Sequence, residues 1–262
     1  MAGLLLMISK FFAQNEWLSI KFSELPIDLK LDQLPSVEFY STFYRYLDQK
    51  YTNLGELPKE WLNIKLNTAK LLAQLIPSGS RILSYGCGLG IIEKYLIENY
   101  GIDEIYGFDS ASSSLISYVD KNFQRITSTA DMPSEKFDVI YLSQVIYALE
   151  DLEVINLLKF LSSYLKYNGK FIISHFSMNG HENGVFLPQR FHRKLLENKI
   201  TNFAKNALFR NNKKFESQGW GYIRDNESVE FLAKSAGFKE MIFICASSQS
   251  FLVCSGDLNT EL

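Results

Sequence analysis

Arg81-Ile-Leu-Ser-Tyr-Gly-Cys-Gly-Leu-Gly90 is the stretch of sequence that decides the fold. Its short apolar run from Ile82 to Tyr85 is typical of a buried strand, and an apolar pattern with helical spacing begins at Ile91. A strand, a glycine turn and a helix in this order form a ligand loop at the carboxyl edge of a parallel sheet. Glycine is needed there because the backbone turns tightly and a Cβ would obstruct a ligand lying against it.

The spacing of the glycines separates two kinds of ligand loop. A dinucleotide-binding loop carries G-x-G-x-x-G and holds a pyrophosphate at the helix N-terminus. In this chain the third glycine comes one position early, at Gly90, and isoleucine stands at position 91. The spacing therefore argues against an NAD-dependent dehydrogenase. A purely structural glycine turn stays open as an alternative.

An acidic residue follows the next predicted strand, about 20 residues beyond the glycines. Glu104-Ile-Tyr-Gly-Phe-Asp109 reads as an apolar strand that ends in a carboxylate. A carboxylate at a strand end can accept hydrogen bonds from the two ribose hydroxyls of a nucleoside. Asp109 could instead cap a helix that opens at Ser110, since aspartate is a good N-cap residue. The two roles are compatible, and the glycine turn nearby favours the ribose.

Further motifs accompany the turn in a fixed order. They are the F-D-V-I strand that begins at Phe137, the step into another strand over residues 165–173, and the helix over 228–238 that ends in Ala-Gly-Phe. With the G-x-G-x-G turn and Asp109, these stretches resemble the motifs of the class I S-adenosylmethionine (SAM)-dependent methyltransferases of the small-molecule type. The resemblance covers about residues 60 to 255, with every element in the family's order.

This resemblance implies an α/β fold with a Rossmann-like, doubly wound sheet of seven strands, six parallel and one antiparallel. Helices precede the first strand, and an insertion follows the fifth. We expect an N-terminal helical extension over residues 1–57, a methyltransferase domain over 58–262, and a substrate-side cap within it at 176–223. Apolar spacing predicts helices over 36–50, 58–75, 112–122, 149–167 and 225–237, and a terminal hairpin over 238–246 and 248–253.

The resemblance also implies a set of cofactor-binding residues. Asp131 would accept a hydrogen bond from the adenine amine, although a plain loop acid is an equal alternative. Asp109 would bind the ribose. The full predicted set for SAM is Ser84, Tyr85, Gly86, Gly88, Gly90, Asp109, Ser110, Ala130, Asp131 and Ser143.

One position departs from the family's pattern. The first strand usually ends in an acid that reaches the methionyl ammonium of SAM, and Ser84 stands at that place. A hydroxyl accepts a hydrogen bond but supplies no opposite charge. Either SAM binds more weakly, or another group such as Glu93 or a residue of the N-terminal helices compensates. The departure also keeps open a catalytically silent, SAM-binding partner subunit.

Histidines are the candidate general bases. An oxygen acceptor with a high pKa needs a base or a desolvating pocket, and imidazole titrates near neutrality. His175, at the end of the fifth strand, is the first candidate and His181 the second, with a purely structural histidine as the alternative. No His, Cys, Asp or Glu cluster has metal-ligand spacing, so we expect no metal ion.

The predicted cap is locally basic. A solvated helix face would explain this, and so would a cover over a phosphate-bearing acceptor. Hence we expect a methyl acceptor that is a small molecule, with an oxygen of a sugar, nucleotide-sugar or other biosynthetic intermediate as the target. An RNA or tRNA methyltransferase is the rival. The basic residues are Arg190, Arg193, Lys194, Lys199, Lys205, Arg210, Lys213 and Lys214.

Composition limits the remaining possibilities. The 262 residues are 47% hydrophobic, which suffices for a sizeable core, and the formal net charge of −2 argues against a whole-surface nucleic-acid binder. Three cysteines without metal spacing fit buried thiols in a reducing compartment. We therefore expect a cytoplasmic monomer or homodimer without a membrane span.

Overall fold

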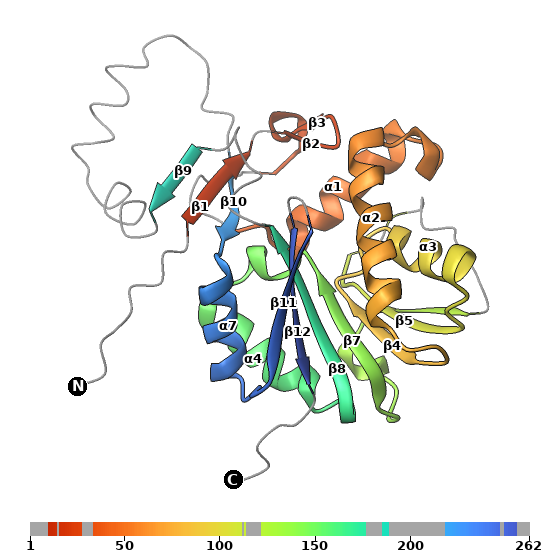
Figure 1. Ribbon diagram of the computed structural model, residues 1–262. Helices are drawn as coiled ribbons and strands as arrows, with labels where there is room; N and C mark the ends of the chain where they lie inside the picture. The colour runs from red at the N-terminus through yellow and green to blue at the C-terminus, as the bar shows by residue number, and fades with distance from the viewer. Residues whose placement is uncertain are drawn as a thin grey trace.

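The computed structural model describes residues 10–14, 16–27, 34–111, 113, 122–176, 185–188, 218–246 and 249–255 (Figure 1). Its centre is a seven-stranded sheet in the order β11-β12-β8-β7-β4-β5-β6. Only β12 runs against its neighbours β8 and β11, so the predicted arrangement of six parallel strands and one antiparallel strand is confirmed. The strands are β4 (Arg81–Tyr85), β5 (Glu104–Phe108), β6 (Phe123–Ile126), β7 (Phe137–Ser143), β8 (Leu165–Phe176), β11 (Met241–Ala246) and β12 (Gln249–Ser255).

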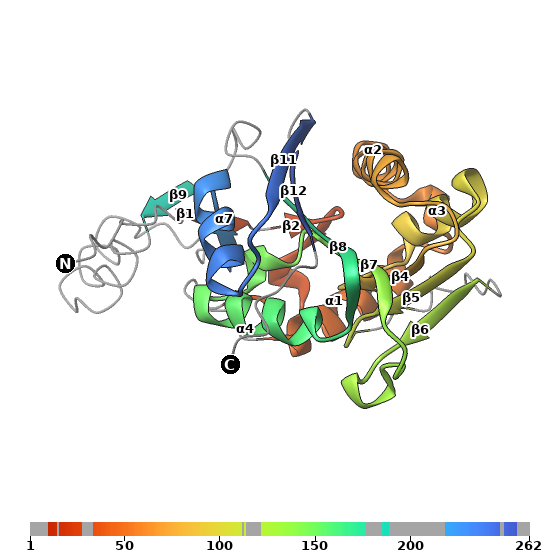
Figure 2. The ribbon, with the colours of Figure 1, turned by 60° about the horizontal axis from the view of Figure 1, so that its bottom comes forward.

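Side chains alternate between the two faces of this sheet, as the pleat of a strand requires. In β7, Val139 and Tyr141 pack with α2 and α3, whereas Ile140 and Leu142 pack with α4 and α7. Both faces are therefore buried, which explains the nearly unbroken apolar runs of the strands. Figure 2 shows one helix pair on each side of the sheet. The helices are α2 (Lys59–Leu75), α3 (Ile91–Tyr100), α4 (Asp151–Ser162) and α7 (Asn226–Ser235).

The predicted helix over 149–167 was too long at its C-terminal end. α4 ends at Ser162, and β8 already begins at Leu165. Asn168-Gly169, a pair that is common at helix ends, lies inside β8, where Asn168 has a φ of 62°. There the pairing with β7 jumps from Phe137–Leu165 to Val139–Lys170, so the left-handed asparagine belongs to a bulge.

An aromatic layer covers the carboxyl end of the sheet. α1 (Val37–Lys50) begins at Ser36, whose side chain accepts a hydrogen bond from the Phe39 backbone nitrogen. Phe39 and Phe43 are buried in the same hydrophobic cluster as Leu89 of the glycine turn. This packing holds the N-terminal helix directly above the turn. The short elements around it are η1 (Phe22–Glu24), η2 (Leu54–Glu56), η3 (Thr129–Asp131) and η4 (Ile146–Ala148).

The residues before α1 also form strands. β1 (Lys10–Gln14) pairs antiparallel with both β9 (Val185–Pro188) and β10 (Gln218–Ile223), and β2 (Glu16–Trp17) pairs with β3 (Ile20–Lys21). The N-terminal stretch is thus tied to both ends of the predicted cap. The predicted helix over 112–122 and most of the cap lie outside the described residues, and the division at residue 57 stays a prediction.

The predicted buried thiols are only partly confirmed. Cys254 is buried and Cys87 is half-buried, but Cys245 is exposed. Cys245 lies on β11, the edge strand of the sheet, and an apolar run on an edge strand need not be covered.

Candidate functional site

A cavity of about 600 Å³ opens at the carboxyl ends of β4, β5 and β7. Its floor is the glycine turn, and its far wall comes from α1, α2 and the segment after β7. A cavity at this edge of a doubly wound sheet is the expected ligand site of the fold. Residues that line it include Trp17, Tyr40, Tyr44, Trp61, Lys65, Ser84, Tyr85, Gly86, Gly88, Glu93, Asp109, Ser110, Ser143, Gln144 and Tyr147.

The glycine turn is fastened to β5 by its backbone. The amides of Gly86 and Cys87 both donate to the carbonyl oxygen of Phe108, at 2.7 and 3.0 Å. Gly86 has a φ of +78°, and a Cβ there would lie 2.5 Å from Cγ2 of Val145. The turn therefore needs glycine both for its conformation and for its close approach to the loop after β7.

Asp109 connects the turn to the end of β5. One carboxylate oxygen accepts from the Gly88 amide at 2.8 Å, and the other accepts from the Ala111 amide at 3.0 Å. Burial raises the pKa of Asp109, and these two amides act in the opposite direction. Each oxygen keeps a lone pair for a further donor. The carboxylate is thus held in place with room to accept hydrogen bonds from a ligand in the cavity.

Ser84 meets a carboxylate that comes from a helix. Its hydroxyl donates to Oε1 of Glu93 at 2.5 Å, and the Tyr141 hydroxyl donates to the same oxygen at 2.6 Å. Glu93 is only 1% exposed, and burial raises its pKa. The structure therefore brings a carboxyl group to the place where the strand itself carries only a hydroxyl.

Lys65 of α2 reaches the same cavity. Its Nζ lies 5.3 Å from the centroid of the Trp61 ring, a favourable position for a cation on an aromatic face. Burial lowers the pKa of Lys65 to about 8, and the charge of Glu93 acts to raise it. The lysine is therefore partly desolvated, and Glu93 on the other side of the cavity favours its protonated form.

A layer of aromatic side chains faces the glycine turn. The hydroxyls of Tyr40 and Tyr147 lie 2.5 Å apart and share a hydrogen bond. Burial raises the pKa of both, that of Tyr147 to about 12, so both are protonated at neutral pH. Trp17 meets Tyr40 edge to face at 6.5 Å. This wall presents flat apolar surfaces with a few hydroxyls to the cavity.

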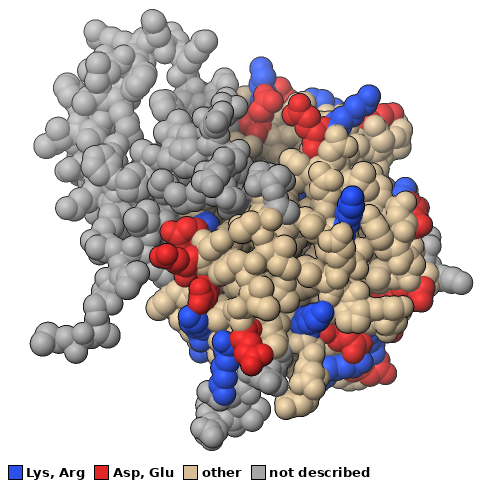
Figure 3. Space-filling view, in the orientation of Figure 1, with Lys and Arg blue, Asp and Glu red and all other residues tan. Residues whose placement is uncertain are grey.

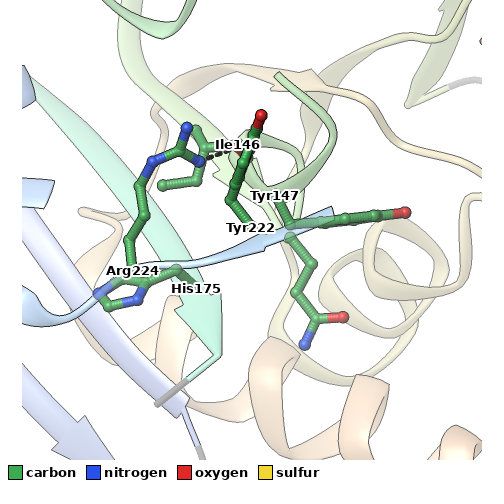
Figure 4. A pocket seen from close by; sticks show the side chains of 6 residues that line it. Ile146, Tyr147, His175, Tyr222 and Arg224 are labelled. Atoms are coloured by element: carbon green, nitrogen blue, oxygen red, sulfur yellow. Dashed lines mark hydrogen bonds between the residues drawn. The ribbon is translucent and has the colours of Figure 1, made fainter. Parts of the chain in front are cut away.

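A second, much smaller cavity of about 10 Å³ lies beside the first (Figure 4). His175 lines this small cavity and is 5% exposed. Gln144 and Tyr147 line both cavities. Figure 4 shows Tyr147 pointing away from His175. The imidazole is thus separated from the larger cavity by the residues that follow β7.

Buried Arg224 organises the same region. Its guanidinium donates to the carbonyl oxygens of Ile146 and Leu149, at 2.5 and 2.7 Å, and to Asp151 at 2.7 Å (Figure 4). These bonds give buried backbone carbonyls at the ends of η4 a charged donor. Arg224 therefore holds the segment that carries Tyr147 into the cavity.

The structure gathers most of the predicted cofactor residues in one place. The predicted residues that line the large cavity are Ser84, Tyr85, Gly86, Gly88, Asp109, Ser110 and Ser143. Gly90 instead begins α3 in a left-handed conformation, and Ala130 and Asp131 are exposed in η3, away from the lining. His181 lies outside the described residues. The ligand contacts of all these residues stay predictions.

Sequence reasoning missed several lining residues. Trp61 belongs to the apolar stripe of α2, whereas Lys65 lies in the same helix and Tyr40 in α1 without any motif that marks them. A helical pattern shows that such residues belong to one face, but it does not say what that face meets. Among the described residues, no group of three His, Cys, Asp or Glu side chains could hold a metal ion.

Comparison with known families decides where the chain belongs. The model of the family described as "Methyltransferase domain" matches residues 59–240, which is more than half of the chain. The chain belongs to this family. The resemblance stated from the sequence motifs is thereby confirmed. None of the curated proteins compared matches the chain.

Solved structures share the fold at low sequence identity. A candidate O-methyltransferase from Nostoc punctiforme PCC 73102 aligns with a TM-score of 0.52 and 17% identity, over 74% of this chain and 60% of its own. Human N-acetylserotonin methyltransferase, solved in complex with SAM, aligns with a TM-score of 0.51 and 15% identity, over 84% of this chain and 56% of its own. The chain thus spans less than two thirds of either protein, and these likenesses support the fold alone.

Proposed function

We propose that the protein is a SAM-dependent methyltransferase that acts on an oxygen of a small molecule. The observation that carries the proposal is the 600 Å³ cavity that joins the glycine turn to Asp109 at the carboxyl edge of the sheet. When bound, SAM supplies a methyl group on a sulfonium that is already an activated leaving group.

The residues of the cavity fit this cofactor. Gly86 and Gly88 have a positive φ and carry no side chains, so a ligand can lie against their backbone on the floor of the cavity. Asp109 has lone pairs for the ribose hydroxyls, and its two backbone hydrogen bonds keep it in place. The tyrosines and tryptophans of the opposite wall would exclude water and orient an acceptor.

An oxygen acceptor agrees with the two structural neighbours, one a candidate O-methyltransferase and the other an N-acetylserotonin methyltransferase. Trp17, Trp61 and Tyr147 suit an acceptor with a flat apolar face, either an aromatic ring or the C–H face of a sugar. A sugar or nucleotide-sugar acceptor stays our prediction. The further prediction that the acceptor carries a phosphate rests on the basic residues of 190–214, which lie outside the described residues.

The general base also stays a prediction. His175 would need to act through Gln144 or Tyr147, the two residues that line both cavities. His181 is the second candidate. A desolvating aromatic wall could instead lower the need for a base, if the acceptor ionises readily. Comparing the pH–rate profiles of wild type and His175→Gln separates these cases.

The rival functions have less support from the described residues. The RNA alternative was motivated by the same basic segment, and on the face seen in Figure 3 Lys and Arg are interspersed with Asp and Glu. The silent-subunit alternative was motivated by Ser84, which now has Glu93 beside it. No helix among the described residues could cross a membrane. A cytoplasmic location and a monomer or homodimer remain predictions.

Calorimetric titration with SAM, S-adenosylhomocysteine and NAD tests the proposal. We expect both adenosyl ligands to bind and NAD not to bind. Asp109→Ala should weaken adenosyl binding at least 10-fold through the lost ribose contacts. Asp138→Ala is the matched control, because Asp138 binds the Arg81 amide and Lys166 and does not line the cavity. Absence of adenosyl binding in the wild type would reject the proposal.

A further inference from the structure

Glu93 has one carboxylate oxygen without a partner. Oε1 receives the hydroxyls of Ser84 and Tyr141, but no hydrogen-bond partner for Oε2 is found among the described residues. The side chain is 1% exposed, and it lines the large cavity. A buried carboxylate oxygen without a donor costs free energy, so the geometry points to a donor that arrives with a ligand.

A positive charge stands in the same cavity. Lys65, from α2, is half-buried and lines the cavity as Glu93 does. Glu93 and Lys65 interact electrostatically, since Glu93 acts to raise the pKa of Lys65 whereas burial lowers it. No ion pair within 4.0 Å between them is recorded in the described part of the chain. The pair can therefore receive a group that carries both charges.

Sheet order places the partner of Glu93 on the side of β4 away from the nucleoside acid. β4 lies between β5 and β7. Asp109 follows β5, whereas Tyr141, which holds Glu93, belongs to β7. A ligand whose ribose is bound by Asp109 and which extends across the end of β4 would bring its other end to Glu93.

We propose that Glu93 and Lys65 bind the amino-acid end of SAM, with Glu93 accepting from its ammonium and Lys65 pairing with its carboxylate. In this arrangement Ser84 and Tyr141 are positioning residues that hold Oε1 and direct Oε2 into the cavity. The acid has moved from the strand to the first turn of α3, where the helix dipole favours a negative charge. The inference rests on the proposed function, because it assigns residues within the same SAM site.

Ligands that lack one charge each provide the test. S-adenosylhomocysteine carries both the ammonium and the carboxylate. Its deaminated analogue lacks the ammonium, its decarboxylated analogue lacks the carboxylate, and 5′-methylthioadenosine lacks both. Calorimetry with all four measures each charge separately, without any turnover.

For Glu93→Gln, we expect affinity to fall about 10- to 100-fold for the two ligands with an ammonium, since hydrogen bonds between charged groups are strong. The other two ligands should bind as they do to wild type. Lys65→Met should instead weaken only the two ligands with a carboxylate. The double variant Ser84→Asp/Glu93→Gln returns the acid to the strand, and it should recover most of the affinity for S-adenosylhomocysteine.

Equal losses for all four ligands, or no loss for any of them, would overturn the assignment of Glu93. Failure of Ser84→Asp to restore binding would also overturn it, since the charge would then not be what matters. If Glu93→Gln does not fold, Lys65→Met still decides, because a loss that is not confined to the two ligands with a carboxylate would overturn the assignment of the charged pair. Failure of the proposed function looks different, because wild type would then bind none of the four ligands.

Discussion

The hydroxyls of Tyr40 and Tyr147 share a 2.5 Å hydrogen bond that joins α1 to η4 across the wall of the cavity. The two residues are separated by 107 positions in the chain. The N-terminal helix is therefore attached to the segment that follows β7, and it is part of the wall of the site. Both side chains are desolvated, so the bond they form is worth more than a similar bond in water.

The tyrosine bond should appear as a coupling energy. Tyr40→Phe and Tyr147→Phe each remove one hydroxyl of this half-buried pair, so each should destabilise the protein by about 1 kcal/mol. The double variant should cost clearly less than the sum, with a coupling of about 1 kcal/mol. Denaturant unfolding measures all four proteins. Simple additivity of the two single changes would contradict the bond.

Gly86 should be far less replaceable than Gly79. Both have a positive φ, +78° and +72°, but a Cβ on Gly86 would strike Val145, whereas a Cβ on Gly79 meets nothing within 4 Å. Gly79→Ala should cost about 1 kcal/mol of stability, from backbone conformation alone. Gly86→Ala should cost about 2–3 kcal/mol and should also weaken S-adenosylhomocysteine binding.

Denaturant unfolding and calorimetry separate the two glycine variants. Gly79 is not among the residues that line the cavity, so its variant should keep the wild-type affinity. Equal stability losses and unchanged ligand binding in both variants would mean that the contact between Gly86 and Val145 has no influence on the site.

Arg224 should be a major determinant of stability. It is 2% exposed and binds two backbone carbonyls and Asp151, so Arg224→Met removes the guanidinium donors from all three acceptors. We expect a loss of about 3 kcal/mol in the free energy of unfolding. Lys166→Met is the control, because Lys166 and Asp138 form an exposed ion pair whose loss should cost about 0.5 kcal/mol. A loss as small as that of the control would refute the buried network.

Lys65 should make stability depend on pH. Burial lowers its pKa from the ordinary 10.5 to about 8, so above pH 8 the folded protein releases a proton that the unfolded chain still holds. The unfolded state then binds more protons, and stability rises with pH over this window. The melting temperature of the ligand-free wild type, relative to Lys65→Met, should therefore increase from pH 8 to pH 9.5. A constant difference would show that Lys65 is not desolvated.

Local patterns were sufficient for much of the architecture. Apolar runs, the spacing of the glycines and the acid at position 109 predicted the parallel strands, the ligand turn and the family. These patterns gave a wrong prediction where one local signal is compatible with two different structures. Asn168-Gly169 is as compatible with a strand bulge as with a helix end, since both need a residue in the left-handed region.

For the large cavity as well, one part could be predicted from the sequence and another part could not. Its floor follows from the turn of Gly86 and Gly88, because a glycine turn between a parallel strand and a helix lies at the carboxyl edge of the sheet. Its walls come from residues distant in the chain, such as Tyr40 and Tyr147. Apolar spacing placed Tyr40 on a helix but not against any partner.

By itself, the sequence determined the order of the strands of the central sheet, the glycine turn and the place of Asp109, because each depends on residues that are neighbours in the chain. It named Glu93 as one possible substitute for the acid missing at Ser84. Only the tertiary structure decided that Glu93 meets Tyr141 and shares a cavity with Lys65. The physical reason is that burial and charge pairing depend on how α2 and α3 pack on the sheet, and periodicity reveals an apolar face but not what that face contacts.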